Sequence, residues 1–278
     1  MQMEWTLVGL VLLSALLHAS WNAVTKASRD PLLNISVVSC TGALVAGTAA
    51  IFLPLPARAA WPYLAATTLV HFVYQIVLVR AYTLGDLSQV YPIARGLAPL
   101  GVALLAALTA GEMPATMQAI GLVLASGAIA SLGIPAAGTS PTATRSAVLT
   151  AVLISAYTTL DGLGVRCAGS PFSYAAWVLW LYAIPIAVTA AIVRRGAVVD
   201  FLRSEGARAA AGGLMAIVGY TVVLWALSQG PMAAVAALRE TSVIFATLVG
   251  VCMLGERFGR RRILASIALA AGLILVQA

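Results

Sequence analysis

The chain has 278 residues, of which 62% are hydrophobic and 9% are charged, and its net charge is +7. Soluble domains carry about 25% charged residues, so this composition excludes an ordinary soluble globular protein. The positive charges lie in short turns between apolar blocks rather than along one face, which excludes a nucleic-acid partner and is typical of orientation by the positive-inside rule.

Apolar blocks follow one another along the whole chain, each of about 20 residues, the length with which a helix crosses a bilayer. Helix breakers and charges separate the blocks, as in Arg29-Asp30-Pro31 and Gly111-Glu112. We therefore predict an all-α membrane protein with ten transmembrane helices. Their approximate ranges are 5–25, 32–53, 61–84, 87–110, 114–134, 146–165, 172–193, 209–228, 231–254 and 260–277.

The basic residues are unequally shared between the two sets of turns. The turns after the odd-numbered spans hold Lys26, Arg29, Arg145, Arg194, Arg195, Arg203, Arg208, Arg257, Arg260, Arg261 and Arg262, whereas the alternate turns hold Arg58 and Arg166. The positive-inside rule places the first set in the cytoplasm. We expect a multi-pass protein of a bacterial cell inner membrane with both termini periplasmic, and a first span that is retained rather than cleaved as a signal peptide.

An internal repeat relates the two halves of the chain. The stretch from Gly85 to Glu112 parallels the stretch from Gly230 to Glu256, because each begins at a glycine turn, crosses one apolar helix and ends in a Gly-Glu pair. Five spans per half is an odd number, so the second half enters the membrane inverted. Such repeats enclose a binding site near the midplane, and we expect a central cavity there. The two five-helix repeats are residues 1–136 and 142–278.

Charged residues inside the fourth and ninth spans are the first candidates for a site. A charge at the membrane centre costs roughly 2.5–3.5 kcal/mol, so it faces the bundle interior and finds a partner. Arg95 lies between two prolines and matches Glu240 in depth through the repeat, with Arg239 beside Glu240. Arg95 and Glu240 could meet as a structural pair. Alternatively, Arg95 binds a substrate carboxylate or phosphate, and Glu240 tunes it or carries a coupling proton.

Asp161, in the sixth span, precedes Arg166 by five residues. We favour an intrahelical ion pair at the membrane interface, where long side chains reach water. A proton site or a substrate site is the alternative interpretation.

Polar residues also recur at helical spacing in two other spans. The third span has His71, Gln75 and Tyr82 on one face, and the first has His18 and Asn22 one turn apart. These faces point to water or ligand, or they form interhelical hydrogen bonds of about 0.6 kcal/mol each. The predicted substrate-binding residues are Arg95, Tyr91, His71, Tyr74, Gln75, Tyr82, His18, Trp21, Asn22, Tyr157, Asp161, Tyr220, Arg239 and Glu240.

Depth separates the aromatic residues into two groups. Tyr91, Tyr157 and Tyr220 lie deep enough for a pocket, whereas aromatic residues near span ends are more typical of an interfacial belt. The other aromatic residues considered are Trp177, Trp180, Tyr182 and Trp225.

Catalytic and metal-binding patterns are missing from the sequence. The three cysteines form no CxxC pair, and the two histidines lie in different spans, so we expect no metal site and no cofactor. Neither a GxSxG motif with a histidine partner nor HExxH is found. The chain is therefore not expected to be an enzyme. An intramembrane enzyme acting on lipid stays as a weak alternative, as does a non-transporting receptor or assembly subunit.

Several of these motifs resemble the EamA-type transporters of the drug/metabolite transporter superfamily. The resemblance rests on His18-Ala19-Ser20-Trp21-Asn22-Ala23 with Lys26, on Tyr91-Pro92-Ile93-Ala94-Arg95-Gly96 with Pro99, on Leu238-Arg239-Glu240-Thr241-Ser242 and on the paired Gly-Glu turns. It implies a ten-helix inverted-repeat fold with a central cavity, and export of amino acids or related metabolites. The tyrosines and tryptophans make the aromatic-amino-acid exporters of the YddG type the most similar class.

The resemblance also implies partners. They are a small-molecule substrate, an amino acid or a related metabolite, and the lipid bilayer, with the protein acting as a monomer by alternating access. Efflux of drugs, nucleotide sugars or cations by the same fold is the alternative. The small multidrug branch has a carboxylate in its first span where this chain has His18 or Asn22. That difference disfavours cationic-drug antiport and favours a facilitated exporter.

Overall fold

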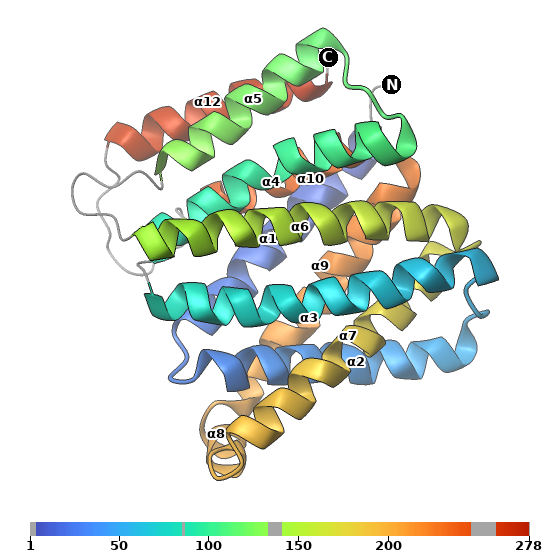
Figure 1. The fold of residues 1–278 in the computed structure, drawn as a ribbon, viewed down its shortest axis with the longest axis vertical. Helices are drawn as coiled ribbons and strands as arrows, with labels where there is room; N and C mark the ends of the chain where they lie inside the picture. Colours follow the sequence, from blue (N-terminus) through green and yellow to red (C-terminus); the bar gives the residue numbers. More distant parts are fainter. Residues whose placement is uncertain (1–3, 85–86, 133–140, 246–259, 278) are drawn as a thin grey trace.

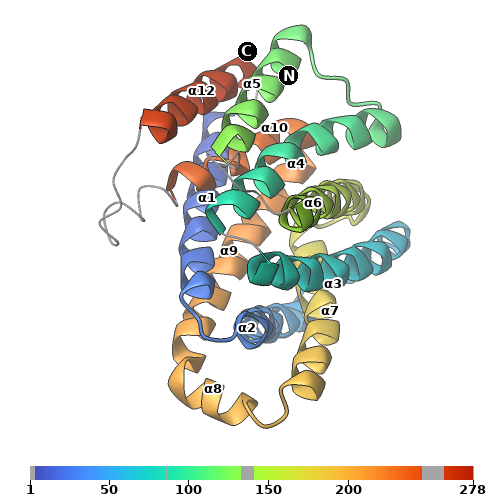
Figure 2. The same ribbon diagram turned by 60° about the vertical axis from the view of Figure 1, so that its left-hand side comes forward.

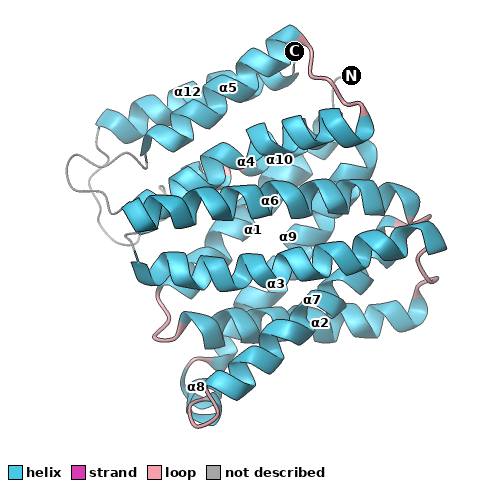
Figure 3. Ribbon diagram, viewed as in Figure 1, coloured by secondary structure: helices cyan, strands magenta, loops and turns pink. Residues whose placement is uncertain are grey.

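The computed structural model describes residues 4–84, 87–132, 141–245 and 260–277. Within these ranges every regular element is a helix, and no strand occurs (Figure 3). The elements are α1 (Trp5–Lys26), α2 (Pro31–Phe52), the 3₁₀ helix η1 (Arg58–Ala60), α3 (Trp61–Leu84), α4 (Leu87–Ala110), α5 (Thr116–Leu132), α6 (Pro141–Cys167), α7 (Pro171–Val193), α8 (Val198–Ser204), α9 (Gly206–Gln229), α10 (Met232–Arg239) and α12 (Arg260–Gln277).

The helices have the length and surface of membrane spans. Seven helices in the described part of the chain are long and apolar enough to cross a bilayer, and Thr116–Leu132 and Ile263–Gln277 are shorter apolar helices. Large apolar side chains point outward, with Leu44 and Leu108 each 74% exposed. Water would disfavour such a surface, whereas lipid tails match it. The chain is therefore a multi-pass membrane protein.

Two elements depart from the ten predicted spans. The short helix α8 lies in the turn between α7 and α9 and buries Phe201, and the sequence analysis did not anticipate it. The predicted ninth span, 231–254, is described only as far as residue 245. Its helix α10 ends at Arg239. The amides of Glu240 and Thr241 then bond to carbonyls three residues back, at 3.0 and 3.2 Å, which tightens the chain away from α-helical geometry.

Local capping explains where the second helix of each half begins. Asp30 precedes Pro31, and its Oδ1 accepts from the amide of Leu32 at 3.0 Å. Ser170 precedes Pro171 in the same way and caps α7. Proline at the first helical position has no backbone N–H to leave unpaired. The polar side chain before it accepts a hydrogen bond from another backbone N–H of the first turn.

Helices distant in the sequence lie side by side (Figures 1 and 2). Helix α1 packs on α9, and α3 packs on α6. Helix α2 contacts both α7 and α9, and α3 also contacts α7. Helix α4 lies against α5, α6 and α10. The first and second halves of the chain are therefore interleaved around a common centre.

Hydrogen bonds between turns divide the helix ends into two opposite faces. On one face, which we call the Asp30 face, Arg194 Nε pairs with Asp30 Oδ2 at 2.7 Å, and the amide of Arg29 donates to Glu205 at 3.4 Å. On the other, the Glu112 face, the amide of Ala57 donates to the carbonyl of Ala168 at 3.1 Å. The turns joined on the Asp30 face hold the basic residues Lys26, Arg29, Arg194, Arg195, Arg203 and Arg208.

Helices α5 and α12, the last helix of each half, form a pair at one edge of the bundle (Figures 1 and 2). Their backbones meet at two glycines. A Cβ atom on Gly121 would lie 2.5 Å from the carbonyl oxygen of Gly272, and one on Gly272 would lie 2.7 Å from the amide nitrogen of Ala125. Only glycine permits this approach, which is a common device for packing helices in lipid.

Candidate functional site

A cavity of about 80 Å³ lies among α1, α2, α3, α6, α7, α9 and the end of α10. It draws its lining from both halves of the chain. Pockets that hold small ligands usually have volumes of about 300–1,000 Å³, so this one is closed around less space than a metabolite needs. Its lining residues are Ser14, His18, Trp21, Ile35, Val38, Ser39, His71, Tyr74, Gln75, Leu78, Tyr157, Tyr182, Met215, Ala216, Gly219, Tyr220, Val223 and Arg239.

Aromatic rings surround His71, one of the residues that line this cavity. The imidazole is stacked on Tyr182, with ring centroids 5.0 Å apart, and it lies 4.1 Å from the ring centroid of Tyr157. Tyr74 and Tyr220 meet it edge-on at 6.5 and 5.8 Å. Three of these four tyrosines come from α6, α7 and α9, whereas Tyr74 shares α3 with His71. The result is an aromatic cluster with His71 in its middle, and its cavity-lining rings offer a surface on which a flat apolar group or a cation can pack.

The polar groups of α3 are held in fixed directions. His71 Nδ1 lies 3.0 Å from the carbonyl oxygen of Thr67, which only accepts, so Nδ1 carries the proton and Nε2 has the lone pair in the neutral ring. Gln75 Nε2 donates to Ser39 Oγ at 3.1 Å. Gln75 Oε1 is buried and has no hydrogen-bond partner among the described residues. An unsatisfied acceptor on a cavity wall is what a ligand donor would satisfy.

Arg95 and Glu240 meet, as the repeat predicted. Arg95 Nε lies 2.9 Å from Glu240 Oε2, and each side chain is only 4% exposed. Arg95 Nη2 also donates to the carbonyl of Arg239 at 3.4 Å. The pair therefore joins α4 to the broken end of α10, and neither residue lines the cavity.

Arg239 is the cation that lines the cavity. It ends α10, its side chain is 5% exposed, and its guanidinium carbon lies 5.6 Å from the ring centroid of Tyr220. No carboxylate in the described ranges forms an ion pair with it. The break in the helix after Arg239 brings this charge to the cavity wall.

Asp161 lies behind the same wall. It is fully buried in α6, and both carboxylate oxygens accept from tyrosines: Oδ1 from Tyr174 Oη at 3.0 Å, and Oδ2 from Tyr220 Oη. The favoured sequence interpretation, an ion pair with Arg166, is wrong. Five residues turn an α-helix through about 500°, which leaves the two side chains about 140° apart around the axis.

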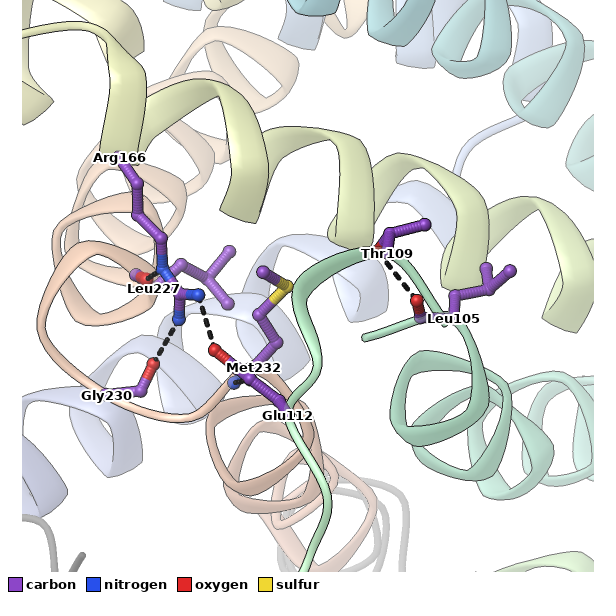
Figure 4. Close-up of polar contacts among 7 residues, drawn as sticks. All are labelled: Leu105, Thr109, Glu112, Arg166, Leu227, Gly230 and Met232. Atoms are coloured by element: carbon purple, nitrogen blue, oxygen red, sulfur yellow. Dashed lines mark hydrogen bonds and ion pairs between the residues drawn. The ribbon is translucent and has the colours of Figure 1, made fainter. Parts of the chain in front are cut away.

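Arg166 instead pairs with Glu112 on the opposite half of the chain (Figure 4). Arg166 Nε donates to the carbonyl of Leu227 at 3.0 Å, and Nη2 donates to that of Gly230 at 2.8 Å. Glu112 Oε2 accepts from the amide of Met232, the first residue of α10, at 2.8 Å. These contacts join the ends of α6 and α9, the start of α10 and the turn at Glu112 on the Glu112 face. A hollow of about 510 Å³ lies beside them.

The remaining predicted site residues are distributed unevenly. His18 and Trp21 line the cavity and contact each other edge-on, with centroids 5.2 Å apart. Asn22 does not line it. Its side-chain amide instead donates to the backbone carbonyl of His18 at 2.8 Å. The side chains of Tyr82 and Tyr91, and the residues around Glu256, lie outside the described part of the structure.

Sequence reasoning missed two tyrosines of the site. Tyr182 stacks on His71, and Tyr174 bonds to Asp161. Tyr182 stands in the middle of α7, so counting its depth within that span would have separated it from the interfacial aromatics. Tyr174 is near the start of the helix, and no pattern in the sequence distinguishes it from a belt residue.

Comparison with known proteins agrees with this architecture. The model of the EamA-like transporter family matches residues 145–277. Among solved structures 28 chains match, and one crystal structure shares 18% sequence identity at a TM-score of 0.78, covering 98% of this chain and 96% of that chain. At that identity the likeness concerns the fold alone. No curated protein matches the chain.

Proposed function

We propose that this chain, a member of the EamA-like transporter family, exports a small metabolite across the membrane, and that the metabolite is an amino acid with an aromatic or other neutral side chain. The premise is membership of that family, which the match over residues 145–277 and the resemblance of the motifs in both halves support. The cargo follows from the chemistry of the cavity.

One observation carries the cargo proposal: Arg239 lines an aromatic cavity, and the carboxylate of Asp161 lies directly behind Tyr220 in the same lining. Arg239 offers a cation for a carboxylate. The Tyr220 hydroxyl donates a hydrogen bond to Asp161, so toward the cavity its oxygen is left as an acceptor backed by a negative charge. An α-amino acid presents a carboxylate and an ammonium on adjacent atoms. The rings of His71 and the tyrosines that line the cavity would then pack against an aromatic or other neutral side chain, so we propose an exporter of the YddG type.

We further propose that the fold is an inverted repeat of two five-span halves, residues 1–136 and 142–278, with the cavity between them. The helix contacts support it. Exchange of the halves matches α1 with α6, α2 with α7, α3 with α9, α4 with α10 and α5 with α12. Under that exchange the pairs α1–α9 and α3–α6 become each other, as do α2–α9 and α3–α7. A carrier of this kind works by alternating access.

The same proposal places the protein in a bacterial inner membrane as a monomer, with both termini on the outer side. The support is the gathering of basic turns on the Asp30 face, which the positive-inside rule assigns to the cytoplasm. Fusions of reporter enzymes to each end test the orientation, and a cytoplasmic C-terminus would overturn it.

Counterflow in proteoliposomes tests the function. Vesicles loaded with unlabelled tryptophan, phenylalanine or threonine are expected to take up the labelled form, with the aromatic substrates preferred. Parallel vesicles receive a quaternary ammonium dye or a nucleotide sugar, which the drug and nucleotide-sugar alternatives predict as cargo. Absence of amino-acid counterflow from a folded sample would refute the cargo proposal.

Arg239→Ala is the decisive variant. A hydrogen bond to a charged group contributes about 1.5–3 kcal/mol, so its loss should weaken amino-acid affinity by about 10- to 100-fold. Arg208→Ala removes an exposed arginine of the Asp30 face as the matched control and should transport normally.

A further inference from the structure

Asp161 is a carboxylate inside the membrane span without a cationic partner in the described residues. It lies six residues before the end of α6, about 9 Å along the helix, and its side chain is fully buried. The three ion pairs of the described structure use Glu240, Glu112 and Asp30 instead. Ionisable groups in membrane interiors mark substrate paths or proton relays.

Polar and charged side chains from several helices lie around Asp161. Tyr174 of α7 and Tyr220 of α9 donate hydrogen bonds to it, and Tyr182 of α7 stacks on His71. Arg239 ends α10 with its guanidinium carbon 5.6 Å from the ring centroid of Tyr220, and Thr67 of α3 has its hydroxyl 3.1 Å from His71 Nδ1. Tyr157 lies one turn before it on α6, with His71 against that ring.

The two tyrosines bonded to Asp161 differ in how far they can move when the carboxylate gains or loses a proton. Tyr174 is wedged against α6, because a Cβ atom on Gly164 would lie 2.5 Å from its hydroxyl oxygen and 2.6 Å from its ring. Tyr220 instead lines the cavity. A change at the carboxylate is therefore transmitted to the cavity through Tyr220.

Protonation of Asp161 reverses the direction of that hydrogen bond. The carboxylate only accepts, so Tyr220 donates to it and turns a lone pair toward the cavity. The neutral acid has one O–H that it can donate to Tyr220, and the tyrosine proton then points into the cavity. An ammonium group fits the first arrangement and is repelled by the second. The negative charge that balances Arg239 is lost at the same time.

We propose that Asp161 carries the proton of an antiport cycle, in which one proton and one zwitterionic substrate occupy the site in turn. This replaces the facilitated export that the first span alone favoured, because Asp161 lies in α6. The inference rests on the proposed export function. A proton from the cavity side passes to Tyr220 while Tyr220 yields its own to Asp161, so no atom is gained or lost. Each cycle moves one proton inward and one electrically neutral substrate outward, which transfers one positive charge.

Proton flux measured with a dye trapped in proteoliposomes tests the proposal. Wild-type protein is expected to move protons when an amino acid that supports counterflow is added on one side, and to accumulate that amino acid on the acidic side of an imposed pH gradient. If counterflow works but protons do not move, antiport is refuted while the export function stands. If counterflow itself fails in a folded sample, the export proposal has failed first.

Variants then locate the proton. Asp161→Asn should lower counterflow, abolish accumulation driven by the pH gradient and flatten the dependence of counterflow on pH, whereas Asp161→Glu should restore part of the coupling. Asp200→Asn removes an exposed carboxylate of α8 and serves as the matched control, with coupling expected to be unchanged. Accumulation driven by the pH gradient in Asp161→Asn would overturn the assignment.

Discussion

The two buried carboxylates of the second half have contrasting surroundings. Glu240 lies 2.9 Å from the guanidinium of Arg95, away from the cavity. Asp161 has two hydroxyls as its partners, one of which belongs to a cavity residue. A charge that is neutralised by an ion pair fixes one helix against another. A carboxylate held only by hydroxyls can change its proton without breaking an ion pair, so the first region is suited to structure and the second to exchange.

Removal of Arg95 should have the largest effect on stability. Arg95→Ala leaves Glu240 buried without its partner, which costs about 3–5 kcal/mol. Thermal unfolding in detergent measures the loss. The double variant Arg95→Met with Glu240→Leu replaces the pair by apolar groups of similar volume and should recover most of the stability. Equal loss in the single and double variants would contradict a purely structural pair.

The glycine contact between α5 and α12 should come next. Gly121→Ala places a methyl group where only 2.5 Å separates it from a backbone oxygen, and such overpacking costs about 1–3 kcal/mol. Gly127→Ala is the control on the same helix, because a Cβ atom there has nothing within 4 Å. Similar unfolding temperatures for the two variants would show that the contact between α5 and α12 adjusts to the added methyl group without cost.

Substitution of the Asp161 partners sharpens the comparison. Tyr174→Phe and Tyr220→Phe each leave one carboxylate oxygen without its hydrogen bond, at a cost of about 1–3 kcal/mol. Stability should therefore fall by similar amounts in both. Counterflow of amino acids should fall further in Tyr220→Phe, because only Tyr220 faces the cavity. Equal transport by the two variants would remove Tyr220 from the proposed relay.

The smallest effect is expected on the Asp30 face. Arg194 pairs with Asp30 but is 43% exposed, and exposed pairs contribute about 0–1 kcal/mol. Arg194→Ala should thus shift thermal unfolding little. Arg166→Ala on the Glu112 face should cost more, because Arg166 also bonds to two backbone carbonyls.

The sequence predicted those features that depend on length, periodicity and the repeat. Apolar blocks located most helices, and matching depth in the two halves paired Arg95 with Glu240. It did not locate the partners of Asp161, because those tyrosines come from α7 and α9 and only tertiary packing brings them together. Nor did it reveal the break after Arg239, since neither glycine nor proline marks it and the Thr241-Ser242-Val243 stretch that follows is only a weak signal against helix.

Helices α5 and α12 contribute no residue to the cavity, although each terminates one half of the chain. Their contact depends on backbone atoms at two glycines rather than on interlocking side chains. Such a joint can pivot while its surfaces stay in touch. In the proposed alternating-access cycle we expect the helices that enclose the cargo to tilt about this edge, with the outermost pair and its lipid neighbours almost undisturbed.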